Sequence, residues 1–281
     1  MCMFHVEKME VDDLPFAVQL ANTMNWNMIP EDFMFMMQLE PKGCFIQFHG
    51  DKPVGIAASI VFGKVGWFGD FVVQEDVRGE GAGSLLVQTA IDYSKSEGAE
   101  TIGLYAYPHL VKFYKRFGFE TDIDFSVLAG KATFSATQEK VKLAEKQDIP
   151  ELIDLDGACF GANRKKLLEP ILLKKENLCY TSAENNEITG FVAAKVYGNQ
   201  AEVGPLICPP NYVDEAKLLL KTILSGLPGF EVSMCIPKRE TALLDMLNKD
   251  GLREEFSVVR MFLGSAIGKN CIYAAESLER G

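Results

Sequence analysis

The sequence predicts an α/β (α+β) protein made of two tandem copies of one fold, each a β-sheet flanked by helices. Its 281 residues exceed the commonest length of a single domain, which lies near about 100 to 150 residues. A shift of about 135 residues brings features of the two halves into register. In both halves, runs rich in Val, Ile and Phe alternate with segments whose apolar residues recur at helical spacing.

The internal repeat preserves the order of its features along the chain. Three pairs of segments correspond: 52–58 with 187–193, 69–73 with 204–208, and 85–89 with 218–222. The third pair falls at a slightly smaller shift. We therefore expect two domains, formed by residues 1–134 and residues 135–281.

Each half predicts the same series of elements. A first strand lies near residues 3–8 and again near 139–143, and helical segments follow it. Three strands joined by short turns come next, then a helix, a strand, a helix and a final pair of strands. The turns have residues typical of hairpins, and they lie at 50–53, 63–64, 184–187 and 198–199.

The charge of the chain narrows the classes of partner. The formal net charge is −11, and residues 1–135 carry 10 Lys and Arg against 18 Asp and Glu. An acidic surface repels nucleic acid and attracts cations, so a small amine is a more natural partner than DNA or RNA. Solubility is an equally good explanation of the charge.

The composition also bears on the cellular compartment. No apolar run approaches the roughly 20 residues that span a bilayer, and Met1–His5 contain no basic region followed by an apolar stretch. We expect a cytoplasmic protein that does not bind a membrane. The seven cysteines are scattered, without a Cys-x-x-Cys pair, and predict reduced thiols.

A glycine-rich segment, Arg78–Gly83, lies between a predicted strand and a predicted helix. The first N–H groups of a helix have no intrahelical acceptor, and the helix dipole adds positive charge there, so this position attracts anions. The three glycines remove side chains that would keep a diphosphate from those amides. Arg78 adds charge at the rim.

The spacing of the glycines excludes two nucleotide-binding motifs. A dinucleotide fold requires Gly-x-Gly-x-x-Gly, but residue 84 is Ser, and the Gly-Lys-Ser/Thr of a P-loop is absent. Residues 72–83 instead resemble the Arg/Gln-x-x-Gly-x-Gly/Ala signature of the GNAT N-acetyltransferases, and 112–119 resemble that family's aromatic-Tyr-x-x-x-Gly-Phe segment. The resemblance extends over essentially the whole chain to a tandem-GNAT group, through Trp26-Asn27, Pro41-Lys42-Gly43 and Arg260–Gly264.

This resemblance implies a twisted mixed sheet whose fourth and fifth strands splay apart, with the pantetheine arm of acetyl-CoA between them. The arm would pair with the main chain of Phe71, Val72 and Val73, as an added strand would. The diphosphate would bind the loop that consists of Arg78, Gly79, Glu80, Gly81, Ala82, Gly83 and Ser84. No metal is required.

Acetyl transfer to an amine requires a base and an acid. An alkyl ammonium has a pKa of about 10.4 and must lose a proton before it attacks the thioester. Asp70, in the strand that leads into the loop, is a candidate base, and a structural role for it is equally open. Glu75 is a weaker candidate, because acidic residues are common in turns. The resemblance implies that Tyr114 protonates the leaving thiolate and that N–H groups near Val73 hold the oxyanion.

Three further residues are candidates for the acceptor site. Trp26 and Asn27 could line it, although a buried Trp at a helix end is nearly as good an explanation. Tyr107 stands where many family members carry Asn, seven residues before the tyrosine. In the second half, 211–216 replace the loop without its glycines and arginine, so we expect CoA in the first half only. The basic residues at 164–166, with those at 174–175, predict a solvated helix face, and contact with the adenosine phosphate of CoA is the alternative.

The sequence thus predicts an acetyl-CoA-dependent N-acetyltransferase that acts on a primary amine of a small molecule or peptide, as a monomer or a homodimer. One alternative is a non-catalytic acyl-CoA sensor. A tandem-GNAT ligase that uses charged tRNA is another, and the acidic charge counts against it. A thiol-cofactor synthase of the same architecture is a third, which rests on fold analogy alone.

Overall fold

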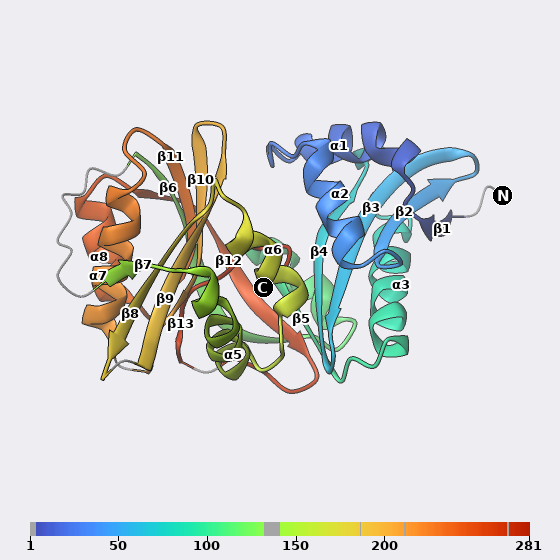
Figure 1. The fold of residues 1–281 in the computed structure, drawn as a ribbon. Helices are drawn as coiled ribbons and strands as arrows, with labels where there is room; N and C mark the ends of the chain where they lie inside the picture. The colour runs from blue at the N-terminus through green and yellow to red at the C-terminus, as the bar shows by residue number, and fades with distance from the viewer. Residues whose placement is uncertain (1–3, 132–140, 186, 211, 269) are drawn as a thin grey trace. The chain divides into compact units, whose positions relative to one another are not determined.

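The computed structural model describes residues 4–131, 141–185, 187–210, 212–268 and 270–281 (Figure 1). It divides into two compact units. The first holds the chain up to Leu104 with 263–265 and 280, and the second holds the rest. The division falls within strand β5 (Thr101–Ala106). The predicted domain boundary, between residues 134 and 135, lies outside the described residues.

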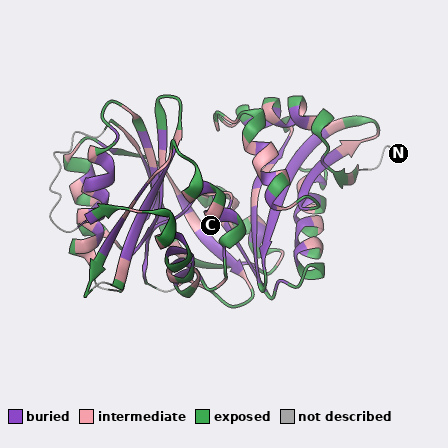
Figure 2. Cartoon of the chain, in the orientation of Figure 1, coloured by how far each residue is buried: buried purple, intermediate pink, exposed green. Residues whose placement is uncertain are grey.

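The first unit is one mixed sheet with helices on it (Figure 1). Its strand order is β1-β2-β3-β4-β5, where β4 and β5 are parallel and the other neighbours are antiparallel. Its other elements are β1 (Phe4–Lys8), α1 (Leu14–Asn22), α2 (Pro30–Leu39), β2 (Cys44–His49), β3 (Lys52–Phe62), β4 (Val65–Val73) and α3 (Ala82–Ser96). The strand interiors are buried (Figure 2).

The second unit has a second mixed sheet, in the order β12-β6-β11-β10-β9-β8-β7, with β13 paired to β10. Its strands are β6 (Glu120–Gly130), β7 (Val141–Leu143), β8 (Leu178–Glu184), β9 (Glu187–Tyr197), β10 (Gln200–Ile207), β11 (Glu231–Pro237), β12 (Arg253–Leu263) and β13 (Ile272–Ala274). Its helices are α4 (Val111–Lys115), α5 (Ile149–Phe160), α6 (Lys165–Leu173), α7 (Val213–Ser225) and α8 (Thr241–Lys249).

The order of elements confirms the predicted repeat and the α/β class. The series from β1 to β6, with α1 to α4, recurs as β7 to β12, with α5 to α8. The first strands begin at Phe4 and Val141, within the predicted segments. Among the described residues, β13 has no counterpart in the first half of the series.

Strand β6 belongs by sequence to the first repeat and by pairing to the second sheet. It pairs antiparallel with β11 on one side and with β12 on the other. Its residues Phe125–Leu128 are buried. The last strand of the first repeat therefore completes the sheet of the second unit. This pairing explains why the compact units divide before residue 134.

Two predictions about side chains are wrong. Cys159 and Cys271 form a disulfide, with their Cα atoms 5.8 Å apart. They are 112 residues apart in sequence, so their spacing gave no signal. Arg164 is buried, and its guanidinium donates to both carboxylate oxygens of Asp156 at 2.9 and 2.6 Å. The prediction of a solvated helix face is therefore wrong for Arg164, whereas Lys165 and Lys166 are exposed.

Candidate functional site

Strand β4 carries a β-bulge at the predicted base. Ala58 of β3 pairs with Gly69, and Ile56 pairs with Val72, so β4 has one more residue than β3 in this stretch. Asp70 lies within the bulge with a φ of 48° and is only 4% exposed. Asp adopts this left-handed conformation more readily than most residues, and bulges re-aim side chains beside functional sites.

The Asp70 carboxylate lies near the thiol of Cys44 on β2. Burial is the main reason that the pKa of Cys44 is raised to about 12, and the charge of Asp70 is the next cause. Cys44 therefore stays a neutral thiol at physiological pH and supplies no nucleophile.

The end of β4 extends past its parallel neighbour. Pairing with β5 joins Val65–Phe68 to Thr101–Leu104. The predicted pantetheine-binding residues Phe71, Val72 and Val73 follow beyond this register, and Val72 and Val73 pair with β3 on the other side. The strand thus continues beyond the point where its parallel pairing ends, which is the geometry that strand addition requires.

The loop after β4 needs its glycines for their backbone conformation. Gly79 and Gly81 have φ values of +85° and +100°, and a Cβ at either position would meet no atom within 4 Å. Gly81 is the N-cap residue of α3. The Arg78 side chain turns back, and its Nε donates to the carbonyl oxygen of Val73 at 3.1 Å. Arg78 therefore fastens the loop to the end of β4.

The start of α3 is electrostatically open to an anion. Within Ala82–Ser96, the first turn contains no acidic residue, so its N–H groups and the positive end of the dipole have no carboxylate of that turn to compensate them. The fully buried Gln47 of β2 donates its amide Nε2 to the carbonyl oxygen of Ala82 at 2.9 Å. Gln47 was not predicted as a site residue. Its one signal in the sequence is a polar side chain between apolar neighbours in a strand.

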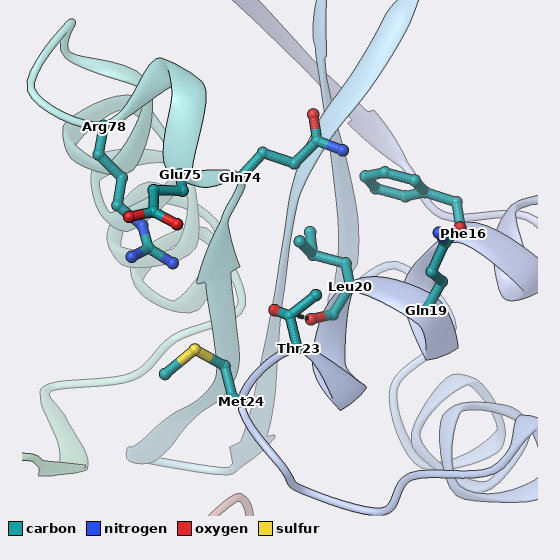
Figure 3. A pocket seen from close by; sticks show the side chains of 8 residues that line it. All are labelled: Phe16, Gln19, Leu20, Thr23, Met24, Gln74, Glu75 and Arg78. Carbon is teal, nitrogen blue, oxygen red and sulfur yellow. Dashed lines mark hydrogen bonds between the residues drawn. The ribbon is translucent and has the colours of Figure 1, made fainter.

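A pocket of about 260 Å³ lies between α1 and the connection from β4 to α3 (Figure 3). Phe16, Gln19 and Leu20 face it from α1, while Gln74, Glu75 and Arg78 form the opposite wall. Thr23 and Met24 complete the lining.

Trp26 and Asn27, the predicted acceptor residues, lie shortly after this pocket in the chain. Among the described residues they are not part of its lining. Trp26 is half-buried, and Asn27 is exposed with a φ of 54°. The structure therefore places both in the connection from α1 to α2, beside the pocket-lining residues in sequence.

Two family models match the chain, one in each half. The acetyltransferase (GNAT) family matches residues 11–119, and the acetyltransferase (GNAT) domain matches residues 152–273. The chain belongs to the GNAT acetyltransferase family. It carries two GNAT domains in tandem, and the matched regions contain the glycine loop of the first and α7 of the second.

Relatives of the chain agree with this assignment. It is 32% identical over 98 residues to an uncharacterised N-acetyltransferase of Methanocaldococcus jannaschii, a match that covers 31% of this chain and 43% of the relative. It is 22% identical over 198 residues to an uncharacterised N-acetyltransferase, YitH, of Bacillus subtilis, which covers 69% of this chain and 68% of the relative. The chain thus spans less than half of the first of these relatives.

A solved structure of a putative acetyltransferase from Pyrococcus horikoshii has the same fold. The TM-score is 0.82 at 23% identity, and the superposition covers 99% of this chain and 96% of the other.

Within the described parts of the chain, no helix is long and apolar enough to cross a membrane.

Tyr114 and Tyr107, predicted in the same motif region, belong to the second compact unit. Tyr114 of α4 is 4% exposed and packs against Phe113 and Phe119. Burial raises the pKa of its phenol above the ordinary value. Tyr107 stacks on His109 and contacts Phe256, with ring centroids 5.8 and 5.5 Å apart.

The second GNAT domain has a different helix start at the position of the loop. Tyr212 is the N-cap residue of α7, and Asp214 and Glu215 lie in its first turn. The Glu215 carboxylate accepts hydrogen bonds from the hydroxyls of Ser182 and of Thr189, the latter at 2.5 Å. Asn211 lies outside the described residues. The two carboxylates would repel a diphosphate at this helix start.

Proposed function

We propose that this GNAT protein is an acetyl-CoA-dependent N-acetyltransferase whose acceptor is a primary amine of a small molecule or a peptide. The first GNAT domain holds the cofactor. The observation that carries the proposal is the loop of 78–84. It combines glycines of positive φ, a first turn of α3 that contains no acidic residue, and an arginine whose side chain bonds to the end of β4.

The pocket of Figure 3 supports a path for the cofactor. A molecule whose diphosphate binds residues 78–84 and whose arm pairs with 71–73 must pass Gln74 and Glu75. These two residues and Arg78 form one wall of the pocket. We assign the pocket to the part of acetyl-CoA between diphosphate and thioester, where Gln19 and Gln74 can hydrogen-bond to the amides of the arm.

The reaction joins the amine nitrogen to the acetyl carbon and breaks the bond from that carbon to sulfur. In this proposal Asp70 takes the proton of the ammonium group, directly or through water. Main-chain N–H groups near Val73 stabilise the oxyanion of the tetrahedral intermediate. In the same proposal, which rests here on the family resemblance, the Tyr114 phenol donates to the leaving sulfur.

The raised pKa of Tyr114 refines its role. A phenol with a pKa above about 10 is a weaker acid than a thiol with a pKa of about 8.5, so complete proton transfer to the thiolate is uphill. Tyr114 therefore acts best as a hydrogen-bond donor that stabilises the negative charge developing on sulfur.

The test is acetyl-CoA consumption across amines, polyamines, amino acids, aminoglycosides and short peptides. We expect one CoA thiol released for each amine acetylated. Asp70→Asn should lower kcat by about 10² to 10⁴, the usual contribution of a proton-transfer group. Tyr114→Phe should lower kcat by about 10² to 10³, the usual cost of removing one donor to a developing negative charge. Both variants should leave the acetyl-CoA Kd nearly unchanged. Binding of acetyl-CoA without thiol release in the whole panel would establish the sensor instead.

The pH profile tests the role of Tyr114. Because burial raises the pKa of Tyr114, its phenol stays protonated below pH of about 10, and Tyr114→Phe should lower kcat/KM equally at every pH below that value. An alkaline limb below pH of about 9 that disappears in Tyr114→Phe would contradict this assignment of Tyr114.

A further inference from the structure

The second GNAT domain also has a place where two parallel strands separate. β10 and β11 pair only from Gln200–Glu202 to Glu231–Ser233. β10 then carries the same kind of bulge as β4, because Val203 pairs with Ala194 of β9 and Leu206 pairs with Val192. The bulge contains Gly204 and Pro205, which correspond in the repeat to Gly69 and Asp70.

A segment near the end of the chain, residues 271–277, lies in this opening and bonds to both of its walls. Ala274 and Ile272 in β13 pair antiparallel with β10. The N–H of Cys208 donates to the carbonyl of Cys271 at 3.1 Å, and the N–H of Ala275 donates to the carbonyl of Cys235, on β11, at 3.0 Å. Every residue of the segment is at most 5% exposed. The segment is thus a strand inserted between β10 and β11.

The absence of a side chain at Gly204 leaves room for this strand. A Cβ on Gly204 would lie 1.9 Å from the carbonyl oxygen of Ala275. No side chain can occupy that position unless one of the two backbones moves. The glycine of the bulge therefore provides the space in which the inserted strand passes.

A buried charge cluster holds the end of the strand. Lys195 of β9 is 2% exposed, and its ammonium donates to the main-chain carbonyl of Glu276 at 2.7 Å and to the Glu276 carboxylate. Lys195 also pairs with Glu202 at 2.8 Å. A buried charge is tolerated when it is paired and hydrogen-bonded in this way.

The first domain carries an apolar pair where the second carries this cluster. Lys195 and Glu202 are cross-strand partners, and their counterparts in the repeat, Ile60 and Trp67, are cross-strand partners in the same way. Ile60 and Trp67 are buried. The charged pair therefore occurs in the domain that has a carboxylate-bearing strand to hold.

We propose that the opening between β10 and β11 is a strand-binding site whose ligand is the chain's own segment 271–277, in the place where the first domain would receive the pantetheine arm. An extended peptide satisfies the main-chain groups of both strands, and the second domain is thereby closed to acyl-CoA. The comparison with pantetheine rests on the proposed function, whereas the peptide site depends only on contacts within the second unit.

The test begins with a protease site inserted between Ala266 and Ile267 of the full chain, which is cut after folding. After reduction of the Cys159–Cys271 disulfide, the cut fragment should remain bound on gel filtration. A labelled peptide of residues 270–281 should exchange into the site at a rate that increases with mild denaturant. A control peptide with Ala275→Pro lacks the N–H that bonds to Cys235 and should bind at least tenfold more weakly. Release of the fragment under native conditions, or equal binding of both peptides, would overturn the proposal.

A second measurement uses the uncut chain. In hydrogen exchange, the amides of 271–277 should be protected like the core, and Gly204→Ala should raise their exchange at least tenfold. Gly157→Ala is the matched control, since its Cβ would lie at an ordinary 3.4 Å from the carbonyl of Ala162. Fast exchange of 271–277 in the unaltered protein would overturn the strand site. Calorimetry should give one acetyl-CoA per chain; no binding at all would contradict the proposed function, and two would contradict the closed second cleft.

Discussion

The openings beside β4 and β10 begin at the same place in the repeat and are completed differently. Each follows a short parallel register and a one-residue bulge. A separated pair of strands leaves main-chain donors and acceptors that need partners. In the second domain, residues 271–277 of the same chain provide these hydrogen-bond partners. In the first domain, we propose that a bound cofactor provides them. The same arrangement of strands therefore holds a segment of the chain itself in the second domain, and in the first domain we propose that it holds the cofactor.

The helices that follow these openings, α3 and α7, also begin differently. α3 begins after glycines of positive φ and has no acid in its first turn, whereas α7 has Asp214 and Glu215 there. A carboxylate near a helix N-terminus compensates the dipole. The second domain therefore provides internally the negative charge that the first would take from a diphosphate.

The largest expected effect on cofactor binding is in the loop of the first domain. Gly81→Val places a β-branched residue at a φ of 100°, a conformation that costs about 1–2 kcal/mol for an L-residue and displaces the amides of the loop. We expect the acetyl-CoA Kd to rise at least 100-fold in calorimetry. Tyr212→Val changes the N-cap of α7 and should leave that Kd within twofold. Similar losses in the two variants would show that the helix starts are not functionally different.

Lys195→Met tests whether the buried charge cluster stabilises the inserted strand of the second domain. Removal of one partner from a buried ion pair leaves uncompensated charge and costs about 3–5 kcal/mol. We expect the free energy of unfolding to fall by that amount in urea denaturation, with an unchanged acetyl-CoA Kd. Lys238→Met, which removes an exposed pair with Glu254 at 3.2 Å, should cost less than about 1 kcal/mol. Equal losses would mean that the cluster does not hold the strand.

The sequence predicted those features whose signals are local. Hairpin turns, helical spacing and the glycines at 79 and 81 act within a few residues, so the order of elements and the loop were recognisable. The alternation of apolar and polar residues along a strand does not identify the strand with which it pairs. The sequence therefore did not predict that β6 pairs with strands of the second unit. Cys159 with Cys271 and Arg164 with Asp156 are pairings made by the fold, and their residue types alone indicated reduced thiols and a solvated face.

Gln47 makes a contact of this non-local kind with the start of α3, and it gives the smallest of the expected effects. It pairs with Gly55 across β2 and β3, as its repeat counterpart Ser182 pairs with Gly190 across β8 and β9. Gln47 bonds to the Ala82 carbonyl at the start of α3, whereas Ser182 bonds to the Glu215 carboxylate at the start of α7. The same position in each sheet therefore anchors the helix that follows the bulged strand.

Gln47→Leu keeps most of the buried volume and removes the donor to Ala82. Since a hydrogen bond contributes about 0.5–1.5 kcal/mol, the acetyl-CoA Kd should rise about two- to tenfold, with kcat at saturating cofactor unchanged because no reacting atom is touched. Ser182→Ala should leave both constants unaltered. If Gln47→Leu lowers kcat without changing the Kd, then Gln47 acts on the reacting groups, and its anchoring of α3 does not determine cofactor binding.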